Sequence, residues 1–151
     1  MNVNAQSTAN ATGSATVIIP ISIAKTTNMS FGNLAVTATA GTVVLAPAGT
    51  RTATAGVTLP NVTGTVTAAA FNVTGEGTST YSISLPSSYT LNGPGGATMV
   101  VDTFTSNPGG TGALTAGAQT ISVGATLNVN GSQAVGSYVN AEGFPVTVNY
   151  N

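Results

Sequence analysis

Apolar and polar side chains alternate along most of this chain, which is the pattern of β-strands with one buried face. The clearest run is "VIIPISI" at residues 17–23, where Val17, Ile19, Ile21 and Ile23 share one face and Pro20 stands between them. No segment has convincing helical spacing, and the abundant Thr, Val, Gly and Asn favour strands and turns. The pattern therefore predicts an all-β protein.

Turn sequences divide the alternating runs into about nine predicted strands. The clearest turns are "NGPGG" at 92–96 and "NPGGTG" at 107–112. The predicted strands lie around residues 15–24, 29–31, 43–45, 53–59, 69–73, 81–85, 97–105, 121–129 and 144–150. Such spacing is typical of an antiparallel, immunoglobulin-like β-sandwich. A β-solenoid is the alternative, and the sandwich is favoured because the chain has no fixed-period repeat.

Both terminal strands contain a proline, Pro20 in the first and Pro145 in the last. Proline cannot donate a ladder hydrogen bond, so both strands are predicted to lie at sheet edges or bulges. The predicted inward face of the terminal edge strand comprises Phe144, Val146, Val148 and Tyr150.

The alternation of the first strand continues upstream, where the in-phase positions are small. A fully extended segment from Gln6 to Ala24 would span about 60 Å at ~3.3 Å per residue, longer than a sandwich of ordinary strands. Either this segment bends back within residues 6–15 or part of it leaves the domain. We expect residues 6–14 to be an extension and 15–151 the sandwich. The residues expected to take part in strand exchange between subunits are Ala9, Ala11, Val17, Ile19, Ile21 and Ile23.

The first residues resemble the end of a trimmed signal peptide. Val3 and Ala5 in "NVNAQS" fit a small-x-small cleavage pattern before Gln6. We therefore expect residues 1–5 to be a signal-peptide remnant, with Met1 as an added start, and the protein to be secreted to the cell surface. The alternative is that these are the native first residues.

Charged residues make up only 3% of the chain and the net charge is −1, which argues against nucleic acid or an anionic membrane surface as partner. No apolar run reaches the roughly 18 residues of a membrane span. The chain has neither Cys nor His, which excludes Cys/His zinc sites, cysteine nucleophiles and histidine triads. Glu76, Asp102 and Glu142 are interpreted as surface charges. We predict no enzyme, no catalytic residue, no metal and no cofactor.

One covalent alternative involves Lys25, which ends the first predicted strand. Some bacterial surface domains join such a lysine to an asparagine on the last strand, here Asn149 or Asn151. An intact mass lower by one ammonia would reveal that amide.

Several blocks in order resemble a family of secreted bacterial domains, domain-of-unknown-function family 4402. These blocks are "ATVIIPISIAKTTNMSFGNL" (15–34), "RTATAGVTLP" (51–60), "FNVTGEGTSTYSISLPS" (71–87), "TFTSNP" (103–108) and "GSYVNAEGFPVTVNY" (136–150). The resemblance implies an immunoglobulin-like fold.

More distantly, the chain resembles archaic chaperone–usher pilins and spore coat U domains. The shared features are a hydrophobic first strand running into "SFG" at 30–32, and an alternating last strand after "GSY" at 136–138. That resemblance implies an incomplete sandwich completed by a neighbour's N-terminal strand, with a periplasmic chaperone and an outer-membrane usher as partners.

Two functions follow as hypotheses. The first is a structural subunit of an extracellular pilus or filament, a homo-oligomer assembled by N-terminal strand exchange. The alternative is a monomeric secreted adhesion or binding module.

Overall fold

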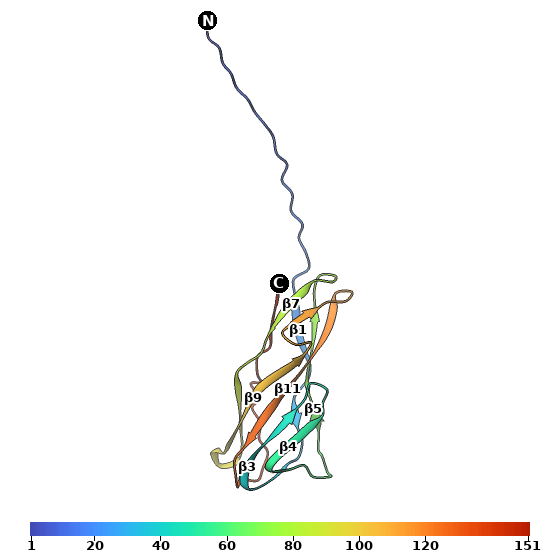
Figure 1. Ribbon diagram of the computed structural model, residues 1–151, viewed down its shortest axis with the longest axis vertical. Coiled ribbons are helices and arrows are strands. Elements are labelled where there is room, and N and C mark those ends of the chain that lie inside the picture. Colours follow the sequence, from blue (N-terminus) through green and yellow to red (C-terminus); the bar gives the residue numbers. More distant parts are fainter.

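The computed structural model describes all 151 residues, and it consists of an extended N-terminal tail and a β-sheet body (Figure 1). Residues 1–21 carry no regular secondary structure. The one helical element is a short 3₁₀ turn, η1 (Pro94–Gly96). The strands are β1 (Ser22–Thr27), β2 (Ser30–Phe31), β3 (Ala35–Leu45), β4 (Arg51–Thr58), β5 (Val66–Thr67), β6 (Ala69–Thr74), β7 (Thr80–Ser84), β8 (Ser88–Asn92), β9 (Thr98–Asn107), β10 (Thr111–Ala113), β11 (Ala118–Val129) and β12 (Thr147–Tyr150).

The largest sheet is built around β11, the longest strand. The first half of β11 pairs with β6 and the second half with β3, both antiparallel. Ser122 and Asn128 each also pair with β9, so β9 lies along the opposite edge of β11. β1 pairs with β6, β4 with β3 and β8 with β9, which completes a seven-stranded sheet.

A second, three-stranded sheet has the order β10-β7-β12, and a short pair joins β2 to β5. All strand pairs are antiparallel, and the prediction of an all-β antiparallel fold is confirmed. The structure has twelve strands: the nine predicted ranges each overlap one of them, and β5, β8 and β10 lie outside those ranges. No helix is long and apolar enough to cross a membrane.

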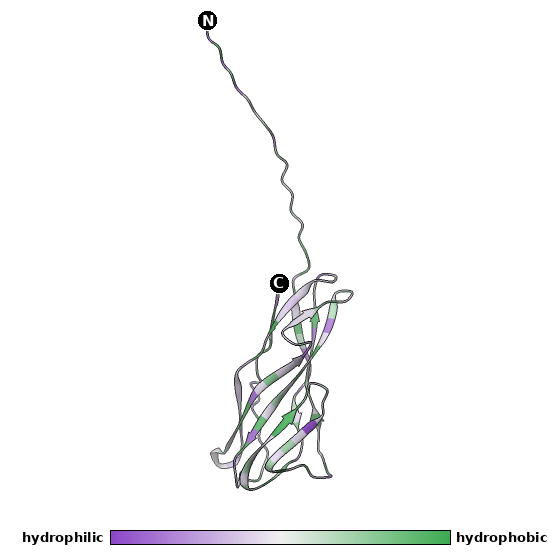
Figure 2. Cartoon of the chain, in the orientation of Figure 1, coloured by the Kyte–Doolittle hydropathy of each residue, from purple (hydrophilic) through white to green (hydrophobic).

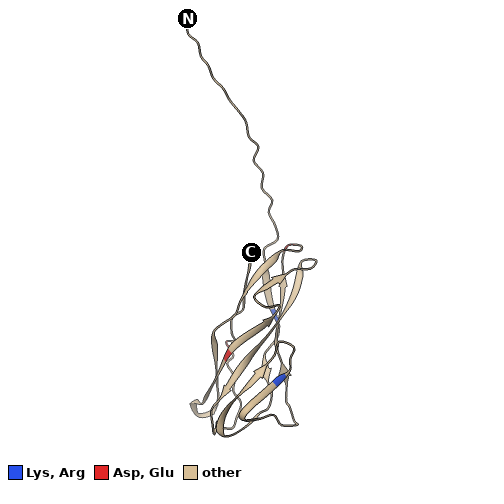
Figure 3. Cartoon of the chain, in the orientation of Figure 1, with Lys and Arg blue, Asp and Glu red and all other residues tan.

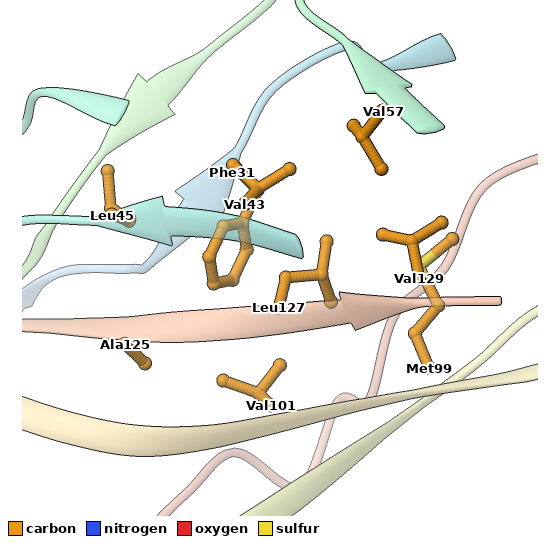
Figure 4. Close-up of a cluster of buried hydrophobic side chains, with 9 residues drawn as sticks. All are labelled: Phe31, Val43, Leu45, Val57, Met99, Val101, Ala125, Leu127 and Val129. Carbon is orange, nitrogen blue, oxygen red and sulfur yellow. The ribbon is translucent and has the colours of Figure 1, made fainter. Parts of the chain in front are cut away.

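Buried apolar residues form two clusters on one face of β11, and Figure 2 shows the apolar positions spread along the strands. The cluster of the first half draws on both layers: Ala69, Phe71, Val73, Tyr81, Ile83, Leu114, Ile121, Val123 and Val148. We call this part the closed half. The cluster of the other half is shown in Figure 4: Phe31, Val43, Leu45, Val57, Met99, Val101, Ala125, Leu127 and Val129. We call it the open half, because all its members except Phe31 come from the large sheet.

The first strand is shorter than its alternation predicted. The ladder to β6 starts at the pair Ser22–Thr74, whereas alternation begins near residue 15. Pro20 lacks an N–H, so the ladder cannot continue through it. The last strand likewise begins at Thr147, two residues after Pro145.

Candidate assembly site: a projecting tail and an open groove

The N-terminal tail leaves the body as a single extended segment (Figure 1). Its largest side chains face solvent: Val17 is 97% exposed, Ile19 58% and Ile18 49%. No charged side chain precedes Lys25 in the sequence, and Figure 3 shows a tail free of charged residues. Three consecutive β-branched apolar residues are thus exposed to water at the base of the tail.

The structure divides the residues predicted for strand exchange into two groups. Ala9 and Ala11 lie in the exposed tail with Val17 and Ile19. Ile21 and Ile23 are half-buried and pack against the core of the closed half. The apolar face of "VIIPISI" is therefore divided. Its C-terminal half packs into the protein's own sandwich, and its N-terminal half stays in solvent.

A set of three hydrogen bonds holds the tail where it leaves the body. The Ile19 N–H donates to Glu76 Oε2 (3.0 Å), and the Tyr150 hydroxyl donates to the Ile19 carbonyl oxygen (2.6 Å). The Glu76 N–H in turn donates to the Tyr150 Oη atom (2.7 Å). We call this arrangement the latch. It joins the tail to the β6–β7 turn and to β12.

Gly75 leaves room for the latch. A Cβ atom at this buried position would lie 2.3 Å from the Tyr150 Oη atom, far inside contact distance. The backbone of Gly75 is outside the left-handed region that favours glycine. The glycine is therefore needed here for the space it leaves to the hydroxyl.

The open half contains a groove of about 1270 Å³. Its lining includes Phe71, Met99, Val101 and Leu127, four buried members of the two core clusters. Segments 27–36 and 133–144 also contribute to the lining. Because a second sheet covers the core in the closed half and not here, the groove runs along the part of the sandwich that lacks a layer.

Arg51 fixes the first of these segments. Its guanidinium donates to the carbonyl oxygens of Phe31, Asn33 (2.7 Å) and Thr63 (3.4 Å). These bonds tie the chain around residues 31–33 to the neighbouring 63–64 loop. A planar guanidinium with several donors suits such a role better than an ammonium group.

The second segment is held at a few points and is otherwise free of backbone pairing. Val139 exchanges two hydrogen bonds with Asn92, and the Asn140 side chain donates to the Thr90 carbonyl oxygen (2.9 Å). The N–H groups of residues 134–138 make no hydrogen bond within the chain. The segment therefore presents unpaired backbone donors beside an apolar groove.

One tyrosine hydroxyl and one phenyl ring anchor this segment to the body, and a second tyrosine hydroxyl makes a hydrogen bond within it. Tyr138 donates to the Ala134 carbonyl oxygen (2.7 Å), and Tyr89 donates to that of Asn140. Burial raises the pKa of Tyr89 above its ordinary value. Phe144 contacts the ring of Phe104 at a centroid distance of 5.0 Å and lies close to Tyr89 and Phe71.

The residues predicted for the terminal edge strand are split as well. β12 ends the three-stranded sheet, with Val148 buried and paired to Ile83, and Tyr150 in the latch. Phe144 and Val146 lie before the strand begins, and Phe144 lines the groove. The structure therefore places these four residues in three different roles.

Sequence reasoning missed the latch and the groove. The sequence indicates that Glu76, in the "GEG" turn, is a surface charge, and nothing in it marks the contact of Glu76 with Ile19, 57 positions away. The groove lies where no second sheet covers the core. Alternation along a strand does not show which part of its buried face a second sheet covers. One signal in the sequence is the pair Val135 and Val139, two apolar residues in a stretch without regular alternation. In the structure these side chains are 99% and 62% exposed.

Lys25 and the terminal asparagines sit on different sheets. Lys25 pairs with Phe71 of β6, while Asn149 pairs with Ser82 of β7 and the Asn151 side chain donates to Thr80 Oγ1 (3.2 Å). No hydrogen bond joins Lys25 to either asparagine. No group of three or more acidic, Cys or His side chains is placed to hold a metal ion.

The family model described as "Domain of unknown function (DUF4402)" matches residues 21–150. This chain belongs to the DUF4402 family. The match starts at Ile21, one residue before β1, so the DUF4402 domain coincides with the β-sheet body and excludes the tail. No curated protein and no solved structure matches the chain.

Proposed function

We propose that this chain is a structural subunit of an extracellular filament, in which residues 9–17 of one copy occupy the groove of the next. The observation that carries the proposal is the coexistence of an alternating apolar tail held outside its own sandwich with an apolar groove in the same body. An added strand would satisfy the unpaired backbone of segment 134–138, as in β-strand addition.

The chemistry of tail and groove is compatible. The tail has no charged side chain, and Lys25 and Glu142 are the charged residues that line the groove. Ala9, Ala11, Gly13 and Ala15 carry little apolar surface, so Val17 is the main apolar anchor. The backbone ladder then supplies most of the affinity, at about 0.5–1.5 kcal/mol net for each hydrogen bond.

The positions of tail and groove favour an open chain of subunits. The tail leaves beside β1 and β7, whereas β3 and β4 of the open half lie at the far end of the body (Figure 1). Contact between two different surfaces is heterologous, and heterologous contacts that do not close generate filaments. The small net charge of −1 adds little repulsion between copies.

The resemblance to archaic chaperone–usher pilins supports the same proposal. On this resemblance the proposal includes secretion through a cleaved signal peptide. It also includes a periplasmic chaperone that shields the groove before assembly, and an outer-membrane usher. No enzymatic activity is part of the proposal.

The test compares the full chain with variants of tail and groove by light scattering, unboiled denaturing gels and negative-stain microscopy. Wild type is expected to form a ladder of oligomers and filaments. Deletion of residues 6–14, and the groove variants Leu91→Glu and Leu34→Glu, should give folded monomers. Val62→Glu, at an apolar residue that is 75% exposed and outside the groove, is the matched control and should assemble as wild type.

Wild type that stays monomeric under all conditions would overturn the proposal. Polymers that persist without residues 6–14 would overturn it too. A circular dichroism melt of each variant separates failed assembly from failed folding.

A monomeric adhesion or binding module is the second candidate. The observation that favours it is the exposed pair Val135 and Val139 on the segment beside the groove, which could contact a protein partner. In that case the tail deletion leaves the monomer and its binding unchanged.

A further inference from the structure

We infer that Tyr150 and Glu76 are positioning residues that direct the tail away from its own groove, so that the groove is left for the tail of a second copy. This inference rests on the proposed function, because it explains why strand addition would occur between copies and not within one. It assigns a role to the two hydrogen bonds at Ile19, which the sheet itself does not need.

Both backbone polar groups of Ile19 are bound by side chains of other segments. The Glu76 carboxylate accepts a hydrogen bond from the Ile19 N–H, and the Tyr150 hydroxyl donates one to the Ile19 carbonyl oxygen. The partners come from a turn and from β12, so they hold the peptide from two sides. The direction of the chain at Ile19 is therefore fixed relative to the body.

The local sequence resists reversal at the same point. Pro20 has a fixed φ angle, and the residue before a proline is driven to extended conformations. Val17, Ile18 and Ile19 are β-branched and favour extended backbone. A turn back toward the body can therefore start only further upstream, and Gly13 is the one glycine of the tail.

A reversal at Gly13 would place the returning strand far from the body. The six residues from Gly13 to Ile19 extend about 20 Å outward at ~3.3 Å each, so the chain before Gly13 would have to retrace that distance before it reached the body. A second copy has no such penalty.

The Tyr150 hydroxyl has no other role in the structure. The backbone of Tyr150 pairs with Tyr81 in the β7–β12 ladder, while both hydrogen bonds of its hydroxyl go to the latch. A Cβ atom at Gly75 would crowd that hydroxyl at 2.3 Å and the buried Leu114 Cδ1 atom at 3.1 Å. Tyr150→Phe is therefore the variant that breaks the latch with the least disturbance of the core.

The experiment uses the full chain, whose lack of cysteine allows two spin labels to be placed at Thr8→Cys in the tail and Val62→Cys in the body. Labelled chains are diluted into unlabelled protein, and pulsed electron spin resonance gives the distance distribution within one copy. Hydrogen exchange of the Ile19 amide is measured in parallel. Wild type should show one narrow, long distance and a protected Ile19 amide.

Tyr150→Phe and Gly75→Ala should broaden the distribution, add short distances and speed exchange of the Ile19 amide by about tenfold. Glu76→Ala should do the same, whereas Glu76→Gln keeps an oxygen acceptor and should restore protection. Tyr81→Phe removes a hydroxyl that binds Gln119, away from the tail, and is the matched control.

An unchanged distance distribution and unchanged Ile19 exchange in Tyr150→Phe and Glu76→Ala would overturn the inference. The outcomes also separate it from the filament proposal. Wild type that never assembles contradicts the filament, while a tail direction that depends on Tyr150 and Glu76 still supports their positioning role.

Discussion

The two halves of the body bury apolar clusters of equal size but cover them differently. In the closed half, β6 and β11 face β7, β10 and β12, so both layers contribute to the nine buried residues. In the open half, eight of nine buried residues belong to the large sheet, and Phe31 alone comes from β2. Short strands and irregular chain stand where a second sheet would lie.

The comparison separates two properties that burial alone does not distinguish. A side chain is buried when any atoms cover it. A sandwich is complete only when a second hydrogen-bonded sheet covers the core. The closed half has both properties. The open half has the first without the second, which is how a well-packed domain retains a groove of about 1270 Å³. The fully covered core and the groove thus lie at different ends of one sheet.

The largest expected effect is the loss of a large side chain from the closed half. Ile121→Ala, at a fully buried position, should lower the free energy of unfolding by about 3–5 kcal/mol, because the cavity would be sealed by both sheets. Met99→Ala beside the groove should cost about 2 kcal/mol, since water can enter the space. Urea unfolding of the two variants measures the difference. Equal losses would show that both halves are packed alike.

A smaller effect is expected from Arg51, which holds one of the segments lining the groove. Arg51→Ala should lower the free energy of unfolding by about 1–2 kcal/mol, because three carbonyl oxygens lose a charged donor at a partly exposed site. Thermal denaturation measures the loss. Arg51→Lys should recover little of it, since an ammonium group cannot span the same acceptors.

Lys25→Ala is the control for charge, because Lys25 is the other cation and makes no side-chain hydrogen bond. A loss as large as that of Arg51→Ala would point to net charge as the cause.

The smallest effect concerns pH and the closed half. Burial raises the pKa of Tyr81 above its ordinary value of 10.0, so the folded state binds the phenol proton more tightly than the unfolded state. The stability from this group is complete below pH 10 and is lost as the pH rises through the folded pKa. Urea midpoints between pH 8 and pH 11 should therefore fall above pH 10. Tyr81→Phe should reduce that fall, and an identical pH profile in the variant would contradict it.

The buried face of β11 could be predicted from alternation. The pattern of residues 121–129 predicts Ile121, Val123 and the alternate residues up to Val129 on one face, and all are buried. That prediction succeeds because a period of two leaves only one buried face for a strand. The period does not show what covers that face. Because β11 contributes to both halves, its sequence does not distinguish the closed half from the open half.

The tail and the latch could be predicted only in part. Excess alternating length indicated that some of residues 6–15 bends back or leaves the domain, but the boundary falls later, between Ile19 and Ile21. The reason is an interaction between distant segments: Glu76 and Tyr150 bind Ile19 across 57 and 131 positions. No local pattern encodes such contacts. Pro20 gave the nearest hint, as an interruption of the ladder.

The way the tail continues β1 has a mechanical consequence. β1 is antiparallel to β6 at the edge of the large sheet, and the tail extends it beyond Ser22. Tension applied through the tail would act along the strand, so the rungs of the β1–β6 ladder would resist it together in shear. Peeling, which breaks rungs one at a time, would require a pull across the strand. The edge position that leaves β1 open on one side therefore does not make it the weak point when the tail is under tension.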